Sequence, residues 1–276
     1  MDWIKKRFKY LFFSTKGLIL VAIAVVSLIT ALFGMLSGPM ADWGIKEVIV
    51  RVLKMNLVES EREGRLIILY HSIAMIVVAI ETYMITDLLK VKDNLRLMIN
   101  STITVGYWMV ALGGLPFAYW GHSWPLHGLY IAGLALIFFA GCVLVVALWP
   151  WKDEYKVTDL AYAHTKKGYS LERMAFFAMA IVTLISALFG AIPGSNYGNG
   201  FNTFLAENVV REPVKTALDL AVIGHLHIML ALIAIACALI ISRWMDFKGI
   251  LHKLAMPLMI VGSVVLASGK IGRAHV

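Results

Sequence analysis

Seven long apolar stretches dominate this chain of 276 residues, and they constrain its fold more than any other feature. A helix that crosses the hydrocarbon core of a bilayer needs about 20 mostly apolar residues, at about 1.5 Å of rise each. The stretches that meet this requirement are Lys16–Leu36, Leu66–Leu88, Leu97–Ala118, Pro125–Trp149, Met174–Ile192, Leu218–Ile241 and Leu254–Gly269. The sequence therefore predicts an all-α polytopic integral membrane helix bundle with seven transmembrane helices.

Composition excludes the other broad classes of protein. Hydrophobic residues make up 60% of the chain and charged residues 15%, against about 45–50% and about 25% in soluble globular domains. A soluble enzyme is therefore excluded, and long apolar blocks with only two cysteines exclude disorder and a disulfide scaffold. Both cysteines, Cys142 and Cys237, lie inside apolar blocks and are interpreted as thiols buried in the membrane.

The basic residues predict the orientation in the membrane. Lys and Arg gather in alternate short loops, at residues 5–16, 90–96, 152–173 and 243–253, as they do on the cytoplasmic side of membrane proteins. The net charge of +8 thus reflects topology, and we expect no nucleic-acid partner. We expect a prokaryotic cytoplasmic membrane with the N-terminus in the cytoplasm. The loop at 39–65 contains a predicted amphipathic surface helix whose apolar side is formed by Ile45, Val48, Val52 and Leu53.

A short sequence in the first apolar stretch recurs in the fifth. Val26–Gly34 and Val182–Gly190 are identical at seven of nine positions. Further along, His71 lies opposite His227. This pattern predicts a parallel repeat of four helices, with a first copy at 1–150, a cytoplasmic linker at 151–173 and a truncated second copy at 174–269. Residues 270–276 resemble the translation of a sequencing adapter and are expected to be non-native, with an eighth helix missing.

Four histidines lie inside the predicted spans, where ionisable residues are costly and indicate function. His71, His127, His225 and His227 are roughly 3–12 Å from the outer ends of their helices, so all four share the outer leaflet. A b-type haem needs two axial imidazoles from different helices at similar depth. His71 and His127 meet that condition within the first copy. The four histidines are therefore candidate ligands of haem iron.

The segment His225-Leu-His227 carries a resemblance to a known family. Two residues on a helix are separated by about 200° of rotation, so the two rings point to opposite sides and would serve separate centres. This pattern resembles the helix of haem-copper oxidase catalytic subunits, which are also built of four-helix arcs. The resemblance implies that His225 and His227 bind separate centres and that His71 is an axial partner. The chain has no His-Pro-Glu-Val-Tyr segment, so a copper centre is not expected.

Glu81 is the other costly residue, because it lies deep in the second stretch, roughly 15 Å below His71. A carboxyl at this depth relays protons or stays protonated and hydrogen-bonded. His122, His164 and His252 lie in loops or at helix ends and are interpreted as solvated or interfacial.

These residues favour a membrane electron-transfer protein, cytochrome b-like, with haem b near the outer face. It would serve as a respiratory-complex subunit with other subunits or a quinone as partners. The alternative is a cofactor-free transporter or channel with a polar path lined by His and Glu, because a single membrane histidine is about as often a hydrogen-bond donor to a neighbouring helix.

Overall fold

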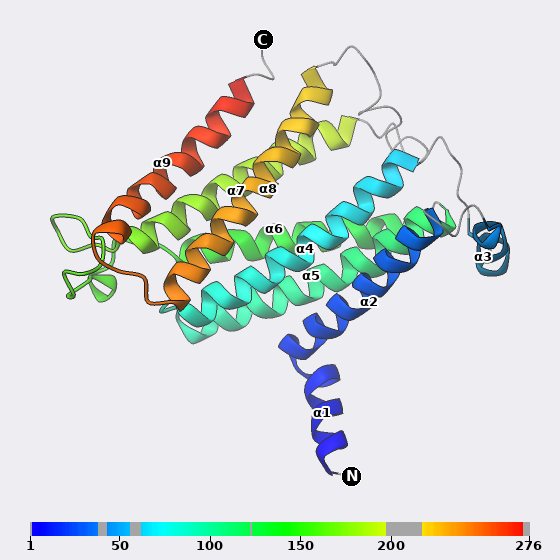
Figure 1. The fold of residues 1–276 in the computed structure, drawn as a ribbon, viewed down its shortest axis with the longest axis horizontal. Coiled ribbons are helices and arrows are strands. Elements are labelled where there is room, and N and C mark those ends of the chain that lie inside the picture. The colour runs from blue at the N-terminus through cyan, green and yellow to red at the C-terminus, as the bar shows by residue number, and fades with distance from the viewer. Residues whose placement is uncertain (1, 38–42, 56–61, 122, 197–216, 273–276) are drawn as a thin grey trace. The chain divides into compact units, whose positions relative to one another are not determined.

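A computed structural model describes residues 2–37, 43–55, 62–121, 123–196 and 217–272 (Figure 1). These residues contain nine α-helices and one short 3-10 turn, Asp153–Tyr155. The helices are α1 (Asp2–Phe13), α2 (Thr15–Ser37), α3 (Ile45–Leu53), α4 (Arg62–Leu88), α5 (Asp93–Trp120), α6 (Trp124–Ala147), α7 (Leu171–Asn196), α8 (Ala217–Trp244) and α9 (Ile250–Gly272). Within the described ranges β structure is limited to isolated bridges, Lys156 with Tyr169 and His164 with Ser170. The all-α prediction is confirmed.

All seven predicted spans lie in helices, but they are not equally long or apolar. Five helical segments are long and apolar enough to cross a membrane: Ile68–Leu88, Asp93–Trp120, Trp124–Ala147, Leu171–Ile192 and Ile223–Trp244. A sixth span results if α1 and α2 are counted together, and the apolar part of α9, Ile250–Leu266, is shorter. Long apolar helices of this kind belong in a lipid bilayer. The sequence predicts seven spans, whereas the described residues satisfy the length requirement five or six times.

The basic N-terminal segment is itself a helix, α1, which meets α2 at an angle of 85°. One side chain serves both helix ends at the bend: the Ser14 hydroxyl donates to Tyr10 O at 2.7 Å and accepts from the Gly17 amide at 3.0 Å. A Cβ at Gly17 would lie 2.0 Å from Tyr10 O, so only glycine fits there. Local sequence therefore builds this bend.

The predicted amphipathic helix between the first two spans is present as α3. Val48, Val52 and Leu53 are exposed on it, as the apolar side of a surface helix requires. Trp120, the last residue of α5, donates its indole N–H to Leu53 O at 2.8 Å. This bond fixes the end of α3 to the end of α5.

The chain forms two compact units. The first contains the described residues of 1–80 and 101–137, and the second contains 81–100, 138–196 and the described residues of 212–276. Helices α4, α5 and α6 each contribute residues to both units. The predicted division into a first copy at 1–150, a linker at 151–173 and a second copy at 174–269 stays a prediction.

Small residues bring α5 and α6 together in the first unit. A Cβ on Gly106 would lie 2.9 Å from Gly133 O, and one on Gly113 would lie 2.6 Å from the amide nitrogen of Tyr130. Such contacts allow helix backbones to approach closely in a membrane. A Cβ on Gly114 would touch the Tyr130 ring on α6 at 2.8 Å and Ile68 on α4 at 3.0 Å. Three helices thus meet at the level of Tyr130.

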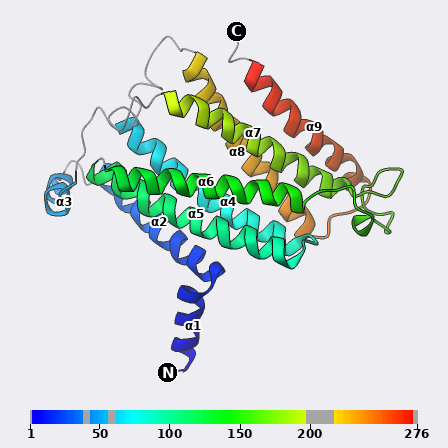
Figure 2. The ribbon, with the colours of Figure 1, turned by 180° about the vertical axis from the view of Figure 1, so that it is seen from behind.

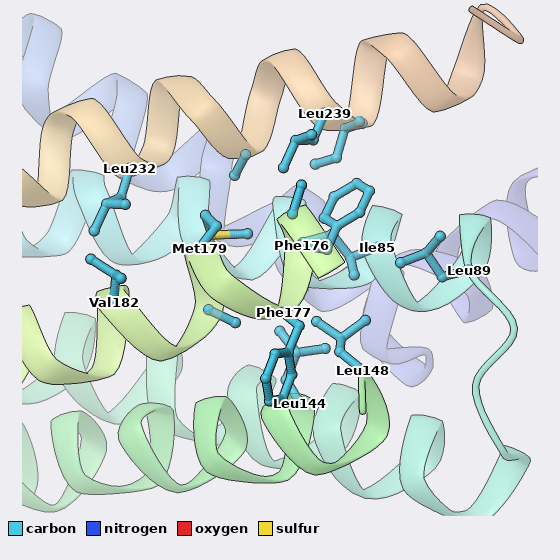
Figure 3. Close-up of a cluster of buried hydrophobic side chains, with 14 of the residues drawn as sticks. Ile85, Leu89, Leu144, Leu148, Phe176, Phe177, Met179, Val182, Leu232 and Leu239 are labelled. Atoms are coloured by element: carbon cyan, nitrogen blue, oxygen red, sulfur yellow. The ribbon is translucent and has the colours of Figure 1, made fainter. Parts of the chain in front are cut away.

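In the second unit α7, α8 and α9 pack on one another (Figure 2). A cluster of buried apolar side chains fills this unit (Figure 3), with members on α7 and α8 and at the C-terminal ends of α4 and α6. Labelled in Figure 3 are Ile85, Leu89, Leu144, Leu148, Phe176, Phe177, Met179, Val182, Leu232 and Leu239.

A buried arginine holds the helix ends beside this cluster. Arg173, in the first turn of α7, donates to Lys90 O at 3.1 Å and to Ala147 O at 2.5 Å. Its guanidinium also lies 3.6 Å from the centre of the Tyr155 ring. Carbonyls at helix C-termini lack intrahelical partners, and a cation satisfies them. Arg173 therefore caps the end of α6 and holds the connection that follows α4 at Lys90.

Helix boundaries recur at the spacing of the repeated sequence. Helix α2 begins at Thr15 and α7 begins 156 residues later at Leu171. Helix α4 ends at Leu88 and α8 ends 156 residues later at Trp244. These boundaries support the predicted four-helix repeat, which stays a prediction.

Candidate functional site

The first two candidate ligands, His71 and His127, both lie in the first unit. His71 is three residues further along α4 than Ile68, and His127 is three residues earlier along α6 than Tyr130. Ile68 and Tyr130 meet at Gly114. Because α4 and α6 run in the same direction (Figure 1), the two histidines lie on opposite sides of this level, about 9 Å apart along the helix axes.

An aromatic ring packs against His127, and a second one lies at Gly114. Phe117 stacks on His127, with ring centres 5.3 Å apart and planes 15° from parallel. Tyr130 is 2% exposed and lies at the contact level between the two histidines. A haem with both as axial ligands would require rings facing each other at one level. The pairing of His71 with His127 as axial ligands stays a prediction.

His225 is part of the contact between α8 and α7. Its Nδ1 lies 2.7 Å from Ser186 O. The ring also covers Gly190, where a Cβ would lie 2.6–2.7 Å from three ring atoms. Gly190 closes the repeated segment Val182–Gly190. This geometry matches the interpretation in which a membrane histidine bonds to a neighbouring helix.

His227 has a different environment, because its side chain is exposed on α8. Its Nδ1 lies 2.8 Å from Ile223 O, the carbonyl one turn earlier on the same helix. A proton on Nδ1 that is donated to this carbonyl leaves Nε2 as the metal-binding nitrogen. Histidines that ligate metals typically hold their other ring nitrogen in this way. His227 therefore fits the role of a ligand, whereas His225 is held against α7.

The four candidate ligands are divided between the two units. His225 and His227 belong to the second unit, and the other two belong to the first. The described residues contain no group of three or more His, Cys, Asp and Glu side chains that could hold a metal ion.

Glu81 is 7% exposed, and its partner was not identified from the sequence. The Cys237 thiol donates to Glu81 Oε1 at 3.1 Å. The two residues are 156 positions apart, the spacing of the repeated helix boundaries, but this spacing alone does not indicate that they are in contact. Glu81 and Cys237 together are the one carboxyl–thiol contact found deep in the described spans. Such a contact holds the carboxyl in place.

The interpretation of His252 as a solvated residue is wrong. Its side chain is 0% exposed, and its Nδ1 accepts a hydrogen bond from the Ala163 amide at 2.9 Å. The start of α9 packs on the linker, because the Gly249 amide also donates to Ala161 O at 2.8 Å. His164 is partly buried and contacts Tyr162 O through Nδ1 at 2.8 Å. His122 lies outside the described residues.

A polar contact outside the spans joins the linker to the end of α8. Tyr162 donates to the carboxylate of Asp246, and Lys248 donates to the same carboxylate at 2.8 Å. The hydrogen bond to Asp246 raises the pKa of Tyr162. The bonds from Lys248 and Tyr162 lower the pKa of Asp246.

Comparison with other proteins identifies no relative: no family model matches this chain, and neither curated proteins nor solved structures contain a significant match.

Proposed function

We propose that this chain is a membrane electron-transfer protein that binds b-type haem through His227. The observation that supports this is the exposed His227 ring with Nδ1 held by Ile223 O. A polar imidazole on the outside of an apolar helix is costly in hydrocarbon, so a ligand or partner that engages Nε2 would lower this cost. When bound, haem would supply a one-electron carrier. The redox partner would be a quinone or another subunit of a respiratory complex.

The experiment is a reduced-minus-oxidised absorbance spectrum of the purified chain produced with a haem supply. We expect a haem α band that His227→Ala removes. The matched control is His164→Ala, which changes a histidine of the linker and should keep the band. A colourless wild-type protein with full helicity by circular dichroism would exclude haem binding.

A second candidate function is a cofactor-free transporter or channel, and the Glu81–Cys237 contact supports it. A buried carboxyl that accepts a hydrogen bond from a thiol on another helix is a suitable group for moving a proton or binding a cation. In proteoliposomes with an internal pH dye, a proton carrier would respond to an imposed potential, and Glu81→Gln would abolish that flux. Glu154→Gln, on the exposed linker, is the matched control. Equal flux in the wild type and Glu81→Gln would rule out a proton path through Glu81.

A further inference from the structure

Helix α1 presents two chemically different sides, and every side chain from Trp3 to Tyr10 is exposed. Ile4, Phe8 and Phe12 repeat at every fourth position and form an apolar side. Lys5 and Lys9, also four residues apart, lie on an adjacent basic side. Trp3 is 68% exposed and Phe13 is 76% exposed, so large apolar groups are uncovered at both ends of the helix.

The charge on this helix is mostly positive, with Asp2 at its first position as the one acidic residue. Between Trp3 and Phe13 it carries Lys5, Lys6, Arg7 and Lys9 and no acidic residue. The Arg7 guanidinium lies 5.6 Å from the Trp3 ring centre, which keeps it close to an aromatic side chain. Helix α3, by contrast, has Glu47 in its first turn and Arg51 in its last. Of these two surface helices, α1 has the net positive charge that an anionic surface attracts.

The bend at Ser14 determines how α1 lies when α2 crosses a bilayer. A helix at 85° to a membrane-crossing helix runs in the plane of the interface. There the apolar side reaches the acyl chains while lysines reach the headgroups. Because Ser14 bonds to both helices and Gly17 allows the close contact with Tyr10 O, this arrangement belongs to the fold.

We propose that α1 is an interfacial helix that binds the headgroups of anionic phospholipids in the leaflet where α2 begins. The exposed aromatic and aliphatic side chains insert among the acyl chains, and the lysines attract negatively charged headgroups. The partner is a lipid surface, because apolar side chains and cations alternate around the helix at the depth where α2 enters the bilayer. This proposal is independent of haem binding.

The test measures which lipids stay with the full chain. The protein is reconstituted into vesicles of phosphatidylcholine and phosphatidylglycerol and re-extracted, and the retained lipids are counted by mass spectrometry. We expect phosphatidylglycerol to be enriched over its share in the vesicles. Lys5→Gln with Lys9→Gln should reduce this enrichment by about thirtyfold, since each lysine near an anionic surface contributes a factor of about five. The matched control, Lys166→Gln with Lys167→Gln, removes the same charge from the exposed linker turn.

A second variant tests the geometry without changing charge. Gly17→Ala places a methyl group against Tyr10 O and should displace α1, so enrichment should fall although all four cations remain. The proposal is overturned if the wild type shows no enrichment, if Lys5→Gln with Lys9→Gln leaves it unchanged, or if the linker control loses as much.

Discussion

Helices α4 and α8 occupy equivalent places in the predicted repeat, yet the same side of each has opposite exposure. Six positions on one side of each helix correspond at a spacing of 156 residues. On α4 none of the six is exposed, and on α8 all six are. The α4 positions are His71, Ala74, Val78, Glu81, Ile85 and Leu88, and the α8 positions are His227, Leu230, Ala234, Cys237, Ile241 and Trp244.

This difference shows that similar sequence does not determine what covers a helix. The α4 side carries a histidine and a carboxyl away from the outside of the bundle, as polar groups in membranes require. The α8 side carries His227 and Cys237 on the outside. Helices α5 and α9 repeat the contrast, because Gly106 contacts Gly133 O whereas a Cβ on Gly262 would meet nothing within 4 Å.

The largest expected effect is the loss of the haem signal when His71 on α4 or His227 on α8 is replaced. We expect His227→Ala to remove a haem signal completely, and His71→Ala to remove at least one, if the two positions are equivalent ligands. The difference spectrum measures both, with His252→Ala and His122→Ala expected to keep the spectrum. Full haem content in both the His71 and His227 variants would show that neither histidine binds haem and that both serve only in helix packing.

Cys237→Glu makes the two copies identical at the Glu81 position. Two carboxyls would then face each other in a low-dielectric site, and the free energy of unfolding should fall by about 2–3 kcal/mol. Detergent unfolding followed by circular dichroism measures this. Cys237→Ser, which keeps a donor for Glu81, should cost less than about 1 kcal/mol. Wild-type stability of Cys237→Glu would mean that the two side chains do not meet.

Gly106 and Gly262 form a matched pair for substitution by alanine. At Gly106 the new methyl group meets Gly133 O at 2.9 Å, so stability should fall by about 1–3 kcal/mol. At Gly262 the site is open, and alanine should stabilise α9 by about 0.5–1 kcal/mol through helix propensity. Thermal unfolding of the two variants compares them directly. A loss of stability in Gly262→Ala as large as that in Gly106→Ala would show that another segment packs against α9 at Gly262.

The smallest effect is expected at Asp246, which is exposed at the end of α8. Its pKa is lowered in the folded state, so its contribution to stability is complete above the ordinary Asp pKa and is lost as pH falls through the lowered value. Asp246→Asn should therefore unfold at a slightly lower temperature than the wild type at neutral pH, and this difference in unfolding temperature should vanish in acid. A thermal unfolding series across pH measures this. A difference that persists in acid would assign the effect to packing.

The helices could be predicted because apolar length and periodicity are local properties of the sequence. The helical state of α1 was missed because basic residues interrupt its apolar pattern, although Ser14 and Gly17 stand where the bend is built. The burial of His252 could not be predicted, since it depends on the linker backbone at Ala163.

The candidate site likewise has one feature that the sequence predicts and one that it does not. The divergence of His225 and His227 follows from helix rotation alone, and the structure has one ring on α7 and the other exposed. The contact of Glu81 with Cys237 depends on how two helices far apart in the chain pack together, which a single sequence does not specify.

Arg173 has a consequence for biosynthesis. The carbonyls that it caps, Lys90 O and Ala147 O, leave the ribosome before it does, because chains emerge from the N-terminus. Until α7 is made, these two carbonyls must bond to water or to another donor. A chain that ends before α7 therefore lacks this contact, and the synthesis of α7 supplies it.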